Sequence, residues 1–180
     1  MDPTTKTTVL IVEDEPVTRR GLQLFVQQLP GISVVDIVDN AESGMQKSHD
    51  LKPDVVLMDI GLPGLDGISA ARQIKKDDPG RRVLMLTANN SDEAIFGAFN
   101  AGADGYVLKT SFAQSLELAI KTVRCGSVWL DPQIAQTILR MAVAKPQNSV
   151  DLSRQEQQVL SELAESSCED GVCFVKPSFV

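Results

Sequence analysis

Short apolar segments alternate with longer amphipathic ones along the first 126 residues of the chain. The apolar segments predict five strands, at residues 8–14, 32–39, 54–59, 81–88 and 105–110. Apolar residues spaced three and four apart predict helices between and after them, at residues 16–29, 41–51, 67–76, 91–103 and 111–126. This alternation predicts an α/β domain with a five-stranded, doubly wound parallel sheet.

Residues at the ends of the predicted helices support this interpretation. Pro16 suits the first turn of a helix, where the missing N–H is not needed. Ser91 is typical of an N-cap, and Gly126 is typical of the residue just after a helix. These residues indicate where three of the predicted helices begin or end.

The pattern changes after Gly126. Residues 127–150 are interpreted as a linker with one amphipathic helix, in which Ile134 and Ile138 share a side. A further helix is predicted after residue 151, with Ser153 and Glu156 forming a capping box, and the rest of the chain has no clear period. The predicted organisation is therefore a domain over residues 1–126, the linker, and a small α-helical extension over residues 151–180.

Composition and charge narrow the classes of protein to consider. Apolar residues make up 43% and charged residues 23% of the chain, as in soluble globular proteins. The net charge of −7 disfavours attraction of the whole molecule to DNA or to an anionic membrane. The chain has no apolar run of the roughly 18 residues that span a bilayer and no visible signal peptide. A cytoplasmic protein without a membrane partner is therefore expected.

The three cysteines indicate neither a disulfide framework nor a metal site. Their odd number, with Cys168 and Cys173 close together near one end, is not typical of a disulfide framework. A zinc site on that pair is disfavoured, because the chain has no second cysteine pair and its one histidine, His49, is distant in sequence. Reduced thiols are expected.

Charged and polar side chains lie where four of the predicted strands end. The first strand ends with Glu13 and Asp14 and the third with Asp59, while Thr87 and Lys109 end the fourth and fifth. Because function gathers at the carboxyl ends of parallel strands, these side chains are expected to converge. Three neighbouring carboxylates repel one another, and a bound divalent cation such as Mg²⁺ removes that conflict.

This constellation predicts phosphoryl chemistry. Asp59 can act as a nucleophile toward a phosphoryl group, with Lys109 supplying positive charge and the Thr87 hydroxyl a hydrogen bond. Each residue alone is more often a capping or solvated group. Their joint occurrence at successive strand ends favours a functional site.

Four motifs, "IVEDE", "LMDIGLPGLDG", "MLTA" and "GYVLKT", resemble the receiver domain of bacterial two-component response regulators over residues 7–126. The resemblance implies a flavodoxin-like fold and phosphorylation of Asp59 by a sensor histidine kinase. It implies a phosphoacceptor that catalyses its own phosphotransfer and dephosphorylation, and not a conventional enzyme. The implied site comprises the Mg²⁺ ligands Glu13, Asp14, Asp59 and the backbone carbonyl of Gly61, the phosphoryl contacts Thr87 and Lys109, and the aromatic switch residue Tyr106. For Tyr106, plain core packing with its hydroxyl at the surface is an equally good interpretation.

Two later segments, "GSVWLDPQIAQTIL" and "LSRQEQQVLSELAE", resemble the linker and first helix of the helix-turn-helix output domain of NarL/FixJ (LuxR-type) regulators. The sequence then reads "SSCEDGVCFVKPSFV" where that family has a basic recognition helix. Residues 145–180 hold six acidic and three basic residues, unlike a DNA-binding module. A truncated or diverged output region is therefore expected.

Two functions stay open. The first is a phosphorylation-switched regulator with a transcription-related or protein-contact output, for which a homodimer is a candidate assembly. The second is a DNA-binding regulator that reaches its promoter through the C-terminal region or an intact dimer partner. A haloacid-dehalogenase-like phosphatase is set aside, because that family's second aspartate would fall at Gly61.

Overall fold

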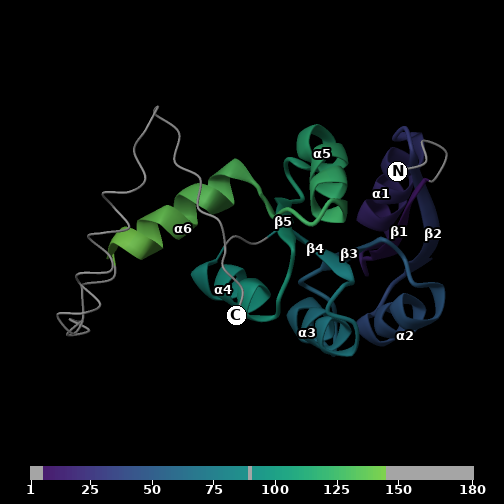
Figure 1. The fold of residues 1–180 in the computed structure, drawn as a ribbon, viewed down its shortest axis with the longest axis horizontal. Helices are drawn as coiled ribbons and strands as arrows, with labels where there is room; N and C mark the ends of the chain where they lie inside the picture. The colour runs from purple at the N-terminus through teal and green to yellow at the C-terminus, as the bar shows by residue number, and fades with distance from the viewer. Residues whose placement is uncertain (1–5, 89–90, 145–180) are drawn as a thin grey trace, which may run out of the picture. The chain divides into compact units, whose positions relative to one another are not determined.

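A six-stranded parallel sheet, with helices on both of its faces, forms the core of the domain that the first 140 residues build (Figure 1). The computed structural model describes residues 6–88 and 91–144. The strands lie in the order β2-β1-β3-β4-β5-β6. Their bounds are β1 Thr7–Val12, β2 Ile32–Val38, β3 Val55–Asp59, β4 Arg82–Thr87, β5 Gly105–Leu108 and β6 Trp129–Leu130.

Helices cover both faces of the sheet. Figure 1 shows α1 and α5 on one side of it and α2, α3 and α4 on the other. Their bounds are α1 Pro16–Gln28, α2 Ala41–Leu51, α3 Gly67–Asp77, α4 Asp92–Asn100 and α5 Phe112–Arg124, and α6 follows at Pro132–Ala144. The predicted doubly wound α/β fold is confirmed.

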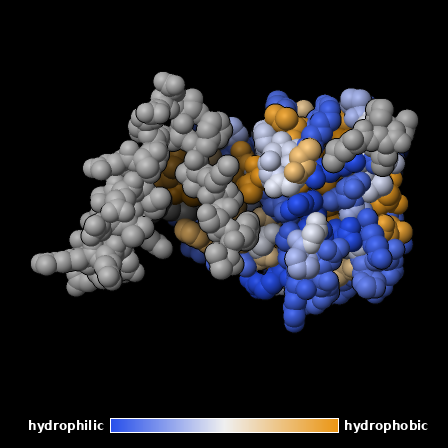
Figure 2. Space-filling view, viewed as in Figure 1, coloured by the Kyte–Doolittle hydropathy of each residue, from blue (hydrophilic) through white to orange (hydrophobic). Residues whose placement is uncertain are grey.

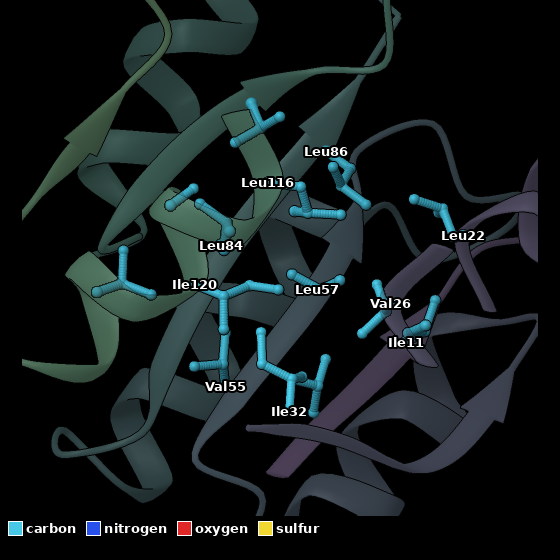
Figure 3. Packing of buried hydrophobic residues seen from close by; sticks show 14 residues of the cluster. Ile11, Leu22, Val26, Ile32, Val55, Leu57, Leu84, Leu86, Leu116 and Ile120 are labelled. Atoms are coloured by element: carbon cyan, nitrogen blue, oxygen red, sulfur yellow. The ribbon is translucent and has the colours of Figure 1, made fainter. Parts of the chain in front are cut away.

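The central strands are apolar throughout because both of their faces are buried. Alternate residues of a strand point to opposite faces of the sheet. Leu57 of β3 and Leu84 of β4 pack toward α1 and α5, where they meet Leu22 and Ile120 (Figure 3). The next residue in β3, Met58, is also fully buried. Polar side chains are therefore accommodated best where the strands end, and that edge carries the candidate site.

The sixth strand is absent from the predicted elements. Trp129 and Leu130 pair with Gly105 and Tyr106 of β5, in a stretch predicted to be a turn. A strand of two residues is too short to show a hydrophobic period. Gly105 permits the pairing, because a Cβ atom there would lie 2.9 Å from the Trp129 carbonyl oxygen.

The last described helix, α6, begins directly after this strand. The Asp131 side chain accepts a hydrogen bond from the backbone N–H of Gln133 (3.1 Å) and one from the Ser111 hydroxyl. The chain divides into two compact units, Met1–Arg140 and Met141–Val180. The helix predicted after residue 151 and the cysteine pair lie outside the described residues.

The surface of the described part is largely hydrophilic over α2 and α3 (Figure 2). No helix within residues 6–88 and 91–144 is long and apolar enough to cross a bilayer.

Candidate functional site

The first two carboxylates stand on the loop between β1 and α1. Glu13 follows the last residue of β1, and its backbone N–H donates to the Val38 carbonyl oxygen (3.0 Å). Glu15 is the N-cap of α1, and Pro16 opens the helix. The strand and the helix therefore leave a short loop in which Glu13 and Asp14 point their side chains toward the neighbouring strand end.

Asp59 completes a cluster of three carboxylates. One side-chain oxygen from each of Glu13, Asp14 and Asp59 lies within 4.8 Å of the others. Glu13 is 0% and Asp59 4% exposed, whereas Asp14 is half-buried. Such a set of oxygen ligands suits Mg²⁺, with the half-open side left for water or a phosphoryl oxygen.

Lys109 joins two of these carboxylates. Its Nζ lies 2.7 Å from Oε2 of Glu13 and 3.0 Å from Oδ2 of Asp59. Burial alone lowers the pKa of Lys109, but its hydrogen bonds to Glu13 and Asp59 together with the charges of these two carboxylates leave the pKa above its ordinary value. Lys109 therefore carries its positive charge at neutral pH.

Burial acts in the opposite direction on Glu13. The pKa of the Glu13 carboxyl lies above its ordinary value because burial disfavours its charged form. The hydrogen bond from Lys109 opposes this effect, and the charge of Asp59 adds to it. A cation held between the carboxylates would offset the cost of burying the Glu13 charge and the repulsion between Glu13 and Asp59.

The loop after β3 turns immediately beside Asp59. The backbone N–H of Gly67 donates to the Ile60 carbonyl oxygen (3.2 Å), which closes the loop. A Cβ atom on Gly67 would lie only 1.8 Å from the backbone oxygen of Asp59. Gly61 is exposed, and a Cβ atom there would lie 3.7 Å from Oδ2 of Asp59. Because residue 61 is a glycine, it places no side-chain atom against the Asp59 carboxylate.

Thr87 is the last residue of β4, and Tyr106 lies in the neighbouring strand β5, opposite Met85. Both are buried, and their side chains share a hydrogen bond. Burial raises the pKa of Tyr106 to about 12, against the opposing effect of that hydrogen bond. The hydroxyl group of Tyr106 is therefore directed into the molecule, toward Thr87, and not to the surface.

One residue at this site does not appear among the predicted ones. Nη1 of Arg19, in α1, donates to the backbone oxygens of Glu13 (3.0 Å) and Asp14 (2.9 Å). Its position five and six residues after those carbonyls, on the first turns of the following helix, is the only signal that the sequence offers. Carbonyl orientation is not visible in residue types, so this contact needed the structure.

Comparisons with known proteins agree with the fold and with these motifs. The family model of the response regulator receiver domain matches residues 9–121. The chain is 32% identical to the response regulator protein VraR of Staphylococcus aureus (strain Mu3) over 152 residues, which cover 84% of this chain and 73% of VraR.

Solved structures extend the likeness. A LuxR-family two-component response regulator from Aurantimonas sp. SI85-9A1 is 34% identical, with a TM-score of 0.74, over 77% of this chain and 99% of that one. The response regulator ChrA of a heme-sensing two-component system is 31% identical, with a TM-score of 0.64, over 91% of this chain and 78% of that one. The chain therefore belongs to the two-component response regulators, in their LuxR-type group, and carries the receiver domain of that family.

Proposed function

We propose that Asp59 accepts a phosphoryl group from a sensor histidine kinase in a Mg²⁺-dependent reaction. The observation that carries this proposal is the position of the Asp59 carboxylate, within 4.8 Å of two further carboxylates and 3.0 Å from the Lys109 ammonium. A carboxylate surrounded in this way has a site for a cation on one side and a fixed positive charge on the other.

The donor set fits Mg²⁺. Glu13, Asp14 and Asp59 offer hard oxygen ligands, and we assign the backbone carbonyl of Gly61 as a fourth. When bound, the ion neutralises charge on the carboxylates and on the phosphoryl oxygens. Glu13 contributes because its burial makes a nearby cation favourable.

Phosphotransfer then needs little more from the protein than position and charge. An Asp59 oxygen attacks the phosphorus of the phosphohistidine, the new P–O bond forms as the P–N bond breaks, and the imidazole nitrogen leaves and is protonated. Lys109 remains close enough to stabilise charge on the phosphoryl oxygens, and the Thr87 hydroxyl can donate to one of them. Hydrolysis of the same P–O bond by water would regenerate the Asp59 carboxylate, so the domain catalyses both steps on itself.

Thr87 and Tyr106 form the proposed switch. Their hydrogen bond joins the Thr87 side chain to the hydroxyl group of Tyr106. When Thr87 turns to a phosphoryl oxygen, this bond must break or rearrange. Phosphorylation thereby acts on Tyr106 and on the strand that bears it.

The test is a phosphorylation assay in which protein mass is measured after incubation with Mg²⁺ and acetyl phosphate. We expect the mass of one phosphate to be added, and none in Asp59→Asn. Asp66→Asn is the matched control, because Asp66 lies on the same loop and caps α3, and asparagine caps helices equally well. Labelling of Asp59→Asn, or its loss in Asp66→Asn, would contradict the assignment.

The output is proposed to be transcription-related, from a cytoplasmic protein. The observation favouring an output region after the receiver is that the match to the response regulator ChrA covers 91% of this chain and so continues past the receiver. Residues 151–180, proposed as a partial LuxR-type output region, lie outside the described residues. A gel-shift assay with phosphorylated protein, alone and mixed with an intact LuxR-type regulator, separates promoter binding from an output through protein contacts. Light scattering of the same samples measures the proposed homodimer.

A further inference from the structure

Arg19 connects α1 to the loop that carries two of the three carboxylates. Its guanidinium donates two hydrogen bonds from one nitrogen, Nη1, to the backbone oxygens of Glu13 and Asp14. The side chain does not pair with a carboxylate of the cluster. It holds the backbone of the acidic residues and leaves their oxygens free for a cation.

The loop needs such a restraint because its own side chains repel one another. Glu13 is fully buried, and Asp14 and Asp59 lie within 4.8 Å of it. Lys109 offsets part of this repulsion through Glu13 and Asp59. Without a further cation, the repulsion that remains favours opening of the loop between β1 and α1. The N-terminal side of the loop is fixed by the hydrogen bond from the Glu13 N–H to Val38, and the Arg19 contacts fix its carbonyls from the helix side.

We infer that Arg19 is a positioning residue for the Mg²⁺ site, which keeps Glu13 and Asp14 in the geometry that the ion requires before it binds. This inference rests on the proposed function, because it assumes that the three carboxylates bind Mg²⁺. Removing a residue that hydrogen-bonds to metal ligands and orients them commonly lowers metal affinity by about 10- to 100-fold.

The sign of the effect distinguishes positioning from simple electrostatics. A guanidinium near a cation site repels the cation, so removing only its charge should tighten Mg²⁺ binding. Removing contacts that order the loop should instead weaken Mg²⁺ binding, because part of the binding free energy must then be used to order the loop. The two roles of Arg19 therefore predict opposite changes.

Arg20 is the natural control. It is the next residue of α1, it carries the same charge, and its Nη1 bonds only the Gln23 side chain among the described residues (2.7 Å). Arg20→Gln removes a charge from the same helix without touching the acidic loop. Arg19→Gln removes the charge and the contacts to both carbonyls.

Mg²⁺ affinity is measured by calorimetry on the full chain. We expect roughly tenfold or greater weakening in Arg19→Gln and an unchanged or slightly tighter affinity in Arg20→Gln. Equal affinity in Arg19→Gln and the wild type, or tighter binding in Arg19→Gln, would overturn the inference. Absence of Mg²⁺ binding in the wild-type protein would instead contradict the proposed function.

Hydrogen exchange in metal-free protein gives a readout that a general loss of stability does not reproduce. Arg19→Gln should speed exchange at the amides of Asp14, Glu15 and Val17 while the amides of β3 and β4 keep wild-type protection. Uniformly faster exchange across the sheet would overturn the positioning role. If Arg19→Gln does not fold, Arg19→Lys supplies both measurements, because lysine keeps the charge but its side chain is shorter than that of arginine. Arg19→Lys should weaken Mg²⁺ binding several-fold. Wild-type affinity in this variant would overturn the inference.

Discussion

At the scale of single residues, the site combines groups that are unfavourable alone. Glu13 is buried with a raised pKa, and Lys109 is held between two carboxylates. Tyr106 is 0% exposed although its hydroxyl must be hydrogen-bonded, and Thr87 provides that partner. Each of these groups is stabilised by another member of the same site, so substitutions here should change more than one property.

Tyr106 is the only tyrosine of the chain, so the absorbance of tyrosinate reports it alone. Because burial raises its pKa to about 12, we expect the absorbance to rise near pH 12 in the folded protein and not near pH 10. A raised pKa means that the folded state favours the neutral phenol. The associated stability is complete below pH about 10 and is lost as the pH rises to about 12, by roughly 2 to 3 kcal/mol.

Alkaline unfolding curves measure that loss directly. Tyr106→Phe is the control, because it keeps the aromatic ring and removes the titrating hydroxyl. Its free energy of unfolding should lack the decrease between pH about 10 and 12. A tyrosinate transition near pH 10 in protein that is still folded would show that Tyr106 is not buried in solution.

At the scale of elements, helix starts are joined to strand ends by short polar contacts. Ser111 precedes α5, Asp131 precedes α6, and the Ser111 hydroxyl donates to the Asp131 carboxylate. The backbone N–H of Asp131 also donates to the carbonyl oxygen of Tyr106 (3.0 Å). Asp131 thus fixes the start of α6 against α5 through its carboxylate and against β5 through its backbone N–H.

Asp131→Ala should therefore destabilise the protein by about 1 to 3 kcal/mol, through the lost helix cap and the unpaired groups left beside it. Asp66→Ala, which removes the cap of α3, is the comparison. It should cost about 1 kcal/mol because Asp66 is exposed, whereas Asp131 is 2% exposed. Urea unfolding measures both, and an equal or smaller cost at Asp131 would contradict the importance of this junction.

At the scale of the whole molecule, bound Mg²⁺ should stabilise the fold. A ligand that binds only the folded state adds about 2.7 kcal/mol at a concentration 100 times its dissociation constant. Thermal unfolding should therefore shift upward on addition of Mg²⁺ and return when a chelator removes it. The carboxylates lie at the ends of β1 and β3, two central strands, so occupancy of the site should affect the cooperative unfolding of the sheet.

Asp14→Ala should show opposite effects with and without the ion. It removes one member of a repelling cluster, so the metal-free protein should be as stable as the wild type or more stable. It also removes a ligand, so most of the upward shift with Mg²⁺ should disappear. Thermal scans of both proteins at matched ionic strength test this, and a full Mg²⁺ shift in Asp14→Ala would contradict its role as a ligand.

The sequence predicts most of this fold because its strands and helices differ strongly in period. Buried runs such as residues 55–58 are apolar on both faces, and Pro16 and Ser91 mark helix starts at the positions observed. Convergence of Glu13, Asp14 and Asp59 follows from the geometry of parallel strand ends.

Features that depend on side-chain or carbonyl direction do not follow from the sequence. Tyr106 could face either the core or solvent from the same backbone, and only packing decides which. The contacts of Arg19 involve backbone oxygens, which every residue has. Trp129 and Leu130 pair over too short a stretch to show a period.

That short pairing also bears on where the domain can be cut. An unpaired strand edge exposes N–H and C=O groups that can recruit another chain. In this protein β6 covers the outer edge of β5 and places Trp129 against the core. A fragment ending at residue 126, the boundary that the helical pattern suggests, would lack β6 and Trp129 and would expose the outer edge of β5. We expect such a fragment to self-associate, whereas one that retains residues 127–140 keeps this edge covered.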